Sequence, residues 1–220
     1  MSSEAQGKKY VVGHGALLEW ALAAWEDTSP SLQLEPVSVG QDGDYRFDLA
    51  ALAQASPADA TAFVAWGPQF LNFRRLELMG ELKSRGFAMP PLVCRGAQVS
   101  SSAQLGENCS IGAGAVVEPR ARIGFNSHVG ASVVVGAGAQ IGTSAWIAAG
   151  ARIGMQSKIG SNTILGDGVS IADGISIGRQ CTLNLPGIQT TALADKTFLL
   201  SGFTTPVTIA EYGAQAAASS

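Results

Sequence analysis

The chain has 220 residues, 46% of them apolar and only 14% charged, so it is long enough to bury a core and too apolar to be disordered. Its formal charge of −3, without any basic run longer than two residues, excludes nucleic acid as the main ligand. The three cysteines, Cys94, Cys109 and Cys181, lack CxxC spacing, which argues against a zinc site or a disulfide framework and favours a cytoplasmic protein.

The first ninety residues predict a small domain in which strands alternate with helices. The expected elements are, in chain order, a strand over residues 8–12, a helix over residues 16–25, strands around residues 34–39 and 61–66, and a helix over residues 70–85. A tight turn, Gly13-His14-Gly15, joins the first strand to the first helix. Such alternation is typical of a parallel sheet, so we predict a Rossmann-like α/β domain over residues 1–90.

A strict period of six residues organises the second half of the chain. Sixteen aliphatic residues follow one another at this spacing without an insertion: Val93, Val99, Leu105, Ile111, Val117, Ile123, Val129, Val135, Ile141, Ile147, Ile153, Ile159, Leu165, Ile171, Ile177 and Leu183. An α-helix turns every 3.6 residues and a strand alternates every two, so neither has this period. A short strand followed by a turn does. Turn residues such as Asn108 and Asn126 also match every 18 residues, or three hexads.

The hexads therefore predict an all-β, left-handed parallel β-helix over residues 91–190, followed by a C-terminal extension and tail over residues 191–220. The uncharged stretch 129–151 is long enough to cross a bilayer. It continues the hexad register, however, and we expect no membrane span. The polar N-terminal residues do not have the pattern of a signal peptide.

Three parts follow one another along nearly the whole chain: an α/β domain, a helix with the paired arginines Arg74 and Arg75, and the hexad repeats. The order resembles the hexapeptide-repeat sugar O- and N-acetyltransferases of the sialic-acid-synthesis and bacillosamine type. The resemblance implies transfer of an acetyl or similar acyl group from acetyl-CoA, or another acyl-CoA, to the amine or hydroxyl of a small-molecule sugar. It also implies a homotrimer with active sites between neighbouring β-helices.

The resemblance also assigns binding residues. The family's Rossmann-like domain holds a nucleotide sugar at a Gly-rich turn with a GHG core and at a glycine after the third strand. These positions correspond here to Gly13, His14, Gly15 and Gly67. The acyl-CoA is expected at five residues of the β-helix, which are Ala137, Trp146, Ala149, Gly150 and Gly168. No metal is expected, and a single histidine in the hexads excludes the three-histidine zinc site of a γ-type carbonic anhydrase.

Acyl transfer needs a group that takes up the proton of the attacking nucleophile, and histidine is the usual choice. His128 is the only histidine within the hexads, and it precedes an inward aliphatic residue, so alternation turns it outward. Trp146 follows 18 residues later in the same column. We therefore predict His128 as the catalytic base or an orienting group, assisted by Glu118.

Apolar outward positions support association of the β-helix. Val116 and Val134 stand in one column, and Trp146 and Ile164 stand in another. Exposed columns of this kind favour burial against a partner. Trimerisation would cover them, and an N-terminal domain folded back over the columns is the alternative.

Several residues depart from the family pattern. Its members carry a Glu-His-acid motif, with this histidine as the usual base, and a second histidine further on. Here Glu118 is retained, Pro119 stands at the base position, Arg120 replaces the acid, and His128 matches the second histidine. The GHG turn is shorter than in the family, and the C-terminal coil lacks the basic residue after proline.

Three interpretations follow from these departures. The first is an acyltransferase without the usual base that N-acylates an amino sugar, because a neutral amine can attack first and lose its proton to water afterwards. A non-catalytic scaffold or regulatory homologue that has lost the base, with Pro119 in its place, is the second. A transferase that uses acyl-carrier protein is the third.

Overall fold

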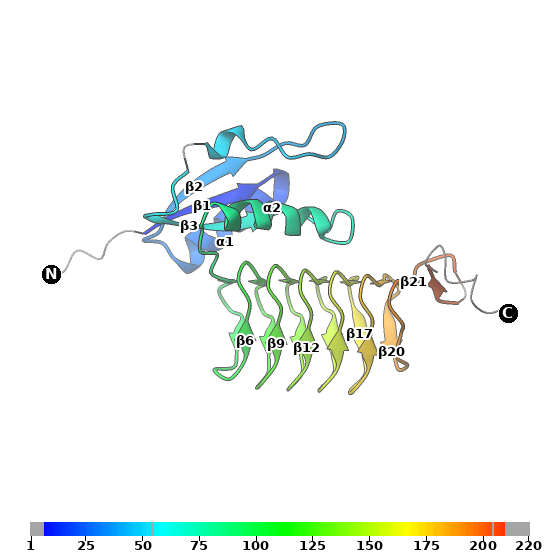
Figure 1. Ribbon diagram of the computed structural model, residues 1–220. Coiled ribbons are helices and arrows are strands. Elements are labelled where there is room, and N and C mark those ends of the chain that lie inside the picture. Colours follow the sequence, from blue (N-terminus) through cyan, green and yellow to red (C-terminus); the bar gives the residue numbers. More distant parts are fainter. Residues whose placement is uncertain (1–6, 54, 204, 210–220) are drawn as a thin grey trace.

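The computed structural model describes residues 7–53, 55–203 and 205–209. An α/β region formed by the N-terminal part of the chain lies over the first coils of a β-solenoid (Figure 1). The first residues of the predicted N-terminal domain, 1–6, and the tail 210–220 lie outside the described residues.

The N-terminal region contains a parallel sheet of three strands in the order β2-β1-β3. Its elements are β1 (Lys8–Gly13), α1 (Gly15–Thr28), β2 (Gln33–Ser38), the 3-10 helix η1 (Ala50–Leu52), β3 (Ala60–Ala65) and α2 (Phe73–Ser84). Val11 and Phe63 face a core shared with α1, whereas Val12 and Val64 face a core shared with α2. The predicted α/β arrangement is thus confirmed. A Rossmann-like fold, which has two βαβαβ halves, stays a prediction.

The helix α2 begins three residues later than the sequence predicts. Phe70, Leu71 and Asn72 have φ values of 48°, 55° and 65°, in the left-handed region that a right-handed helix cannot use. These three residues turn the chain after β3 and place Asn72 against the solenoid, where it is buried.

The solenoid has three parallel faces, and each coil contributes one short strand to each face. The first sheet contains β4 (Leu92–Val93), β7 (Ser110–Ile111), β10 (His128–Val129), β13 (Trp146–Ile147), β16 (Ile164–Leu165), β19 (Thr182–Leu183), β21 (Thr197–Leu199) and the antiparallel β22 (Val207–Thr208). The second sheet contains β5 (Gln98–Val99), β8 (Val116–Val117), β11 (Val134–Val135), β14 (Arg152–Ile153), β17 (Val169–Ile171) and β20 (Gly187–Gln189). The third sheet contains β6 (Gln104–Leu105), β9 (Arg122–Ile123), β12 (Gln140–Ile141), β15 (Lys158–Ile159) and β18 (Ser176–Ile177).

The register of the solenoid repeats every 18 residues, as the sequence predicts. His128 pairs with Ser110 on the preceding coil and with Trp146 on the following coil. The second residue of each hexad strand points inward, and residues such as Ile111 and Ile147 are completely buried. The solenoid confirms the predicted parallel β-helix and supports its left hand.

Glycines after the inward aliphatic residues allow successive coils to approach each other. A Cβ atom at Gly160 would lie 2.4 Å from the carbonyl carbon of Gly178 and 2.5 Å from the amide nitrogen of Arg179. Both neighbours are backbone atoms of the next coil, so neither can swing away. The glycine column is therefore a packing requirement of the ladder.

Gly160→Ala is expected to lower the free energy of unfolding by about 3 kcal/mol, because overpacking against a rigid backbone forces the coils apart. Gly40→Ala is the matched control, since a Cβ there meets no atom within 4 Å. Denaturant titration of both variants measures the difference. Equal stability of the two variants would contradict the steric argument.

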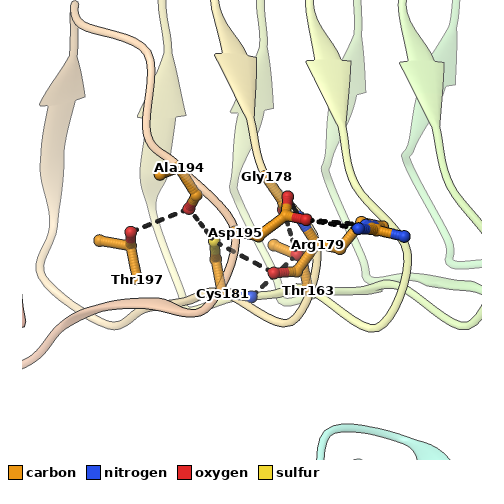
Figure 2. A network of polar contacts seen from close by, with 7 residues as sticks. All are labelled: Thr163, Gly178, Arg179, Cys181, Ala194, Asp195 and Thr197. Carbon is orange, nitrogen blue, oxygen red and sulfur yellow. Dashed lines mark hydrogen bonds and ion pairs between the residues drawn. The ribbon is translucent and has the colours of Figure 1, made fainter. Parts of the chain in front are cut away.

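The C-terminal segment closes the far end of the solenoid (Figure 2). Arg179 and Asp195 form an ion pair of 2.7 Å between Nη2 and Oδ2. The thiol of Cys181 and the hydroxyl of Thr197 both donate to the carbonyl of Ala194, at 3.1 and 2.8 Å. These contacts bind the extension to the preceding coil and cover part of an otherwise open strand edge.

Buried polar contacts join the α/β region to the corner between the third and first sheets. Arg75 donates from Nε to Asn126 Oδ1 at 3.1 Å and from Nη2 to the carbonyl of Asn108 at 3.0 Å. Asn72 Nδ2 donates to the carbonyl of Ser144 at 2.7 Å. The two regions are therefore held in one fixed arrangement.

Among the described residues, no helix is both long and apolar enough to cross a membrane.

Candidate functional site

The imidazole of His128 lies on the outer face of the first sheet between two indoles. The ring of Trp146 stacks on it with centroids 4.0 Å apart and planes at 27°. Trp20, on α1, meets it at 5.7 Å and 79°. Ser110 Oγ lies 2.8 Å from Nδ1. The predicted neighbour Trp146 is therefore in place, and α1 folds back over this column, which was the alternative cover for it.

Burial keeps His128 neutral. Desolvation, together with the nearby positive charge of Arg75, lowers the pKa of His128 from 6.5 to about 3. The imidazolium form is disfavoured because a charged ring would lose its hydration and meet another cation. At neutral pH the ring therefore has one nitrogen that donates and one that accepts a hydrogen bond.

A cavity of about 380 Å³ opens between α1 and the solenoid beside His128. Trp20, Cys94, Asp27 and Arg95 also line it. Asp27 and Arg95 form an exposed ion pair of 3.3 Å. Burial raises the pKa of the Cys94 thiol, so this group is not a thiolate at neutral pH.

Glu118 does not lie beside His128 within one chain. It follows β8 of the second sheet, at the corner that leads to the third sheet, whereas His128 lies in the first sheet. Its Oε2 accepts a hydrogen bond of 2.8 Å from the amide of Ala137, one coil further on. Arg120, with φ of 62°, forms the same corner and donates its amide to Ser102 Oγ at 3.1 Å.

The five expected coenzyme residues divide between two corners of the solenoid. Trp146, Ala149, Gly150 and Gly168 lie along the edge from the first to the second sheet, whereas Ala137 lies on the edge from the second to the third. Gly150 and Gly168 have φ values of 67° and 66°, and a Cβ on either would meet no atom within 4 Å. The edge from the first to the second sheet is therefore open at these two glycines.

The four expected sugar-nucleotide residues gather at the carboxyl edge of the small sheet. Gly13 pairs with Ala65, and a Cβ on it would lie 2.1 Å from the Ala65 carbonyl oxygen, so strand packing requires this glycine. His14 is exposed at the N-terminus of α1, and its ring lies 6.2 Å from that of Trp66, which precedes Gly67. Gly15 adopts φ of 55° beside open space.

A larger cavity, of about 960 Å³, runs between α2 and the third sheet. Its cations are Lys83, Arg122, Lys158 and Arg179. Lys83 is paired with Glu107, and Arg179 with Asp195. Within the described part of the chain, Arg122 and Lys158 have no carboxylate within ion-pair distance. An anionic group would find this groove favourable.

Ser110 and Trp20 are contacts of His128 that the sequence reasoning missed. The 18-residue column that relates His128 to Trp146 also leads back to Ser110, so the periodicity contained that signal. Trp20 belongs to a different region, and no periodic relation connects it with the hexads. No group of three or more His, Cys, Asp or Glu side chains suited to a metal occurs among the described residues.

Comparison with known proteins identifies relatives of the fold. The family model described as the GMPPB C-terminal domain matches residues 88–197. No curated protein matches the chain. Solved structures match the chain over most of its length. They include hexapeptide-repeat sugar acetyltransferases, which confirms the resemblance drawn from the sequence.

Two of these structures come from Caulobacter crescentus, and both are in complex with CoA and GDP-perosamine. A histidine-to-asparagine mutant of perosamine N-acetyltransferase is 20% identical with a TM-score of 0.75, and the protein named PerB is 19% identical with a TM-score of 0.72. Each match covers 90% of this chain and 95% of the other. WeeI from Acinetobacter baumannii AYE is 15% identical with a TM-score of 0.57, over 87% of this chain and 95% of the other. At these identities the likeness concerns the fold.

Proposed function

Because the chain belongs to the GMPPB C-terminal domain family and follows the fold of a perosamine N-acetyltransferase over 90% of its length, we propose that it transfers an acyl group from a CoA thioester to a sugar. The observation that carries this proposal is the setting of His128. Its ring is fixed by Ser110 and Trp146 and borders a cavity between α1 and the solenoid. We assign the acceptor as the amine of a nucleotide-linked sugar.

The N-terminus of α1 supports the binding of the nucleotide part. Its first turn has no acidic residue, and no side chain caps it. Free amides at a helix N-terminus attract phosphate groups. His14 and Gly15 lie at this end, and Gly67 follows the end of the neighbouring strand β3. The diphosphate would approach here, with the sugar directed toward the solenoid.

The open corner at Ala149, Gly150 and Gly168 fits the pantetheine arm of an acyl-CoA, and Trp146 offers an apolar wall beside it. CoA also carries phosphates that need cations. Arg152, in β14 of the second sheet, is exposed and unpaired within the described part of the chain, and it can supply this charge. The residues present therefore fit the co-substrate.

The coenzyme supplies the thioester, and in the transfer a C–N bond forms, the C–S bond breaks and the amine proton passes through water to the CoA sulfur. The chain's own part is to position and to polarise. His128 lies where the acyl group would meet the acceptor, and Trp20 and Trp146 exclude water from two sides of it. Glu118 holds the Ala137 amide and so fixes the corner beside Pro119. Since Glu118 and His128 lie on different sheets of one chain, we propose that a homotrimer brings them to one site.

The test is calorimetric titration with acetyl-CoA, beside desulfo-CoA, followed by mass spectrometry of nucleotide-linked amino sugars incubated with acetyl-CoA. We expect one coenzyme per chain and transfer to an amine. His128→Ala should lower kcat about 10²-fold, the usual effect of losing one polar group from acyl-transfer machinery. His14→Ala, on the other region, is expected to raise KM for the sugar instead. Light scattering of the same samples reports whether the protein is a trimer.

Absence of heat at millimolar acetyl-CoA would contradict the CoA-dependent transferase. Transfer from an acyl-carrier protein under those conditions would replace it with the carrier-dependent enzyme. Absence of transfer from both donors would favour the scaffold, in which Pro119 stands in place of the lost base.

A further inference from the structure

The hydrogen bond between Ser110 and His128 determines which imidazole nitrogen holds the proton. Ser110 lies in β7, directly opposite His128 in β10, and is completely buried. Its Oγ is 2.8 Å from His128 Nδ1. Among the described residues, Nδ1 is the only hydrogen-bond partner of this hydroxyl.

The direction of this bond follows from what each arrangement leaves unsatisfied. If Nδ1–H donated to Ser110, the serine proton would be buried without an acceptor, which costs about 1 to 3 kcal/mol. If the serine hydroxyl donates to Nδ1, neither the hydroxyl proton nor Nδ1 is left without a partner. A neutral imidazole that accepts at Nδ1 carries its proton on Nε2.

The other nitrogen, Nε2, borders the cavity. Nε2 has no hydrogen-bond partner within the described part of the chain, yet it is not among the buried atoms that lack one. His128 lines the cavity beneath α1, so Nε2 is the accessible edge of the ring. The stack with Trp146 and the edge contact with Trp20 prevent the ring from turning this edge away.

We propose that Ser110 is a positioning residue that holds His128 as an Nε2–H donor, so that His128 hydrogen-bonds the acyl oxygen instead of removing a proton, and that the acceptor is restricted to amines. This inference rests on the proposed function. An amine attacks in its neutral form and releases its proton afterwards, whereas a sugar hydroxyl must lose its proton to a base during attack. Developing negative charge on the acyl oxygen is then stabilised by Nε2–H.

Charged and titratable neighbours agree with a donor role. The low pKa of His128, caused first by burial and then by Arg75, makes the ring a weak base. Asp27 is engaged with Arg95 at the cavity, and the Cys94 thiol stays protonated. Pro119, at the position of the family's usual base, has no group that could accept a proton.

Nitrogen-15 NMR of the whole protein tests the tautomer without any substrate. The chain has two histidines, so the exposed His14 serves as the internal control. We expect His128 to show a protonated Nε2 and an unprotonated Nδ1 from pH 5 to pH 8. A protonated Nδ1 in the wild-type protein would overturn the proposal.

Ser110→Asp separates the donor from a base by kinetics. An aspartate would accept a proton from Nδ1 and leave Nε2 as an acceptor, which makes His128 a stronger base and removes the donor. We expect kcat to fall about 10²-fold with little change in KM for acetyl-CoA, as for the loss of one oxyanion donor. Ser110→Thr keeps the hydroxyl and should keep both the NMR signature and most of the activity.

Retained or increased activity in Ser110→Asp would overturn the donor role. A rise of the wild-type kcat/KM with pH near 6.5, as expected for a histidine base, would also overturn it. So would equal turnover of hydroxyl and amine acceptors. If acetyl-CoA does not bind, the proposed function fails while NMR still decides the tautomer. If the Nε2–H tautomer is present and no acyl transfer occurs, the donor role is overturned and Ser110 is structural only.

Discussion

Arg75→Ala is expected to lower the free energy of unfolding by about 2 to 5 kcal/mol, the range seen when a large buried side chain is truncated to alanine. Arg75 is only 2% exposed, and its guanidinium lies at the junction of the two regions. Its removal leaves the Asn108 carbonyl without this donor and empties the space above the corner. Denaturant unfolding followed by tryptophan fluorescence measures the loss.

The setting of Arg75 is unusual because neutral groups alone satisfy it. Burial lowers the pKa of Arg75 to about 10, so the group is still a cation at neutral pH. Among the described residues no carboxylate pairs with it, and its partners are Asn126 Oδ1 and the carbonyl of Asn108. The ring of Phe63, 5.9 Å away, adds a cation–π contact.

Two further variants separate charge from volume. Arg74→Ala removes the preceding arginine, which pairs with Glu77 on the helix surface, and should cost less than about 1 kcal/mol. Arg75→Met keeps most of the volume and removes the charge, with an expected loss of about 1 to 3 kcal/mol from the acceptors left buried. A methionine variant as stable as the wild type would show that the buried cation gives no net stability.

The solenoid could be predicted almost residue by residue because one local rule repeats. Each hexad supplies its own strand, turn and inward side chain, so the period alone assigns Val93 through Leu183 to their faces. The steric reason for the glycines, such as Gly160, is also periodic, since each coil meets the next in the same register.

Contacts between the two regions could not be predicted from the same pattern. Trp20 meets His128, and Arg75 meets Asn126, across sequence separations without any periodic relation. The late start of α2 likewise depends on the left-handed backbone of residues 70–72, where Asn72 contacts the solenoid. The helical spacing of the sequence does not indicate this turn.

The separation of Glu118 from His128 has a simple geometric cause. Ten residues are not a multiple of the 18-residue coil, so the two side chains lie on different faces of the prism. Ser110 and Trp146 are each one full coil from His128 and therefore lie beside it. In a solenoid, sequence distance modulo 18 decides which side chains of one chain can act together.

The burial of His128 between Ser110 and Trp146 also predicts a stability that depends on pH. The pKa of His128 is about 3 in the folded protein against 6.5 in the unfolded chain, so between these values only the unfolded chain binds the proton. The contribution of the neutral His128 to the free energy of unfolding is fully present above pH 6.5 and is lost as the pH falls toward 3. Between pH 7.5 and pH 5 this linkage removes about 2 kcal/mol, a figure that holds for any folded pKa below about 4.5.

Acidic and basic groups elsewhere also titrate, so the measured quantity is a difference between variants. His128→Gln has no titrating ring and keeps an amide that can bond to Ser110. The free energy of unfolding of the wild type minus that of His128→Gln should therefore fall by about 2 kcal/mol from pH 7.5 to pH 5. Measuring the same difference in a His14→Gln background removes the other histidine from the comparison. A pH-independent difference between the wild type and His128→Gln would mean that His128 titrates normally in the folded protein and that the column does not hold it neutral.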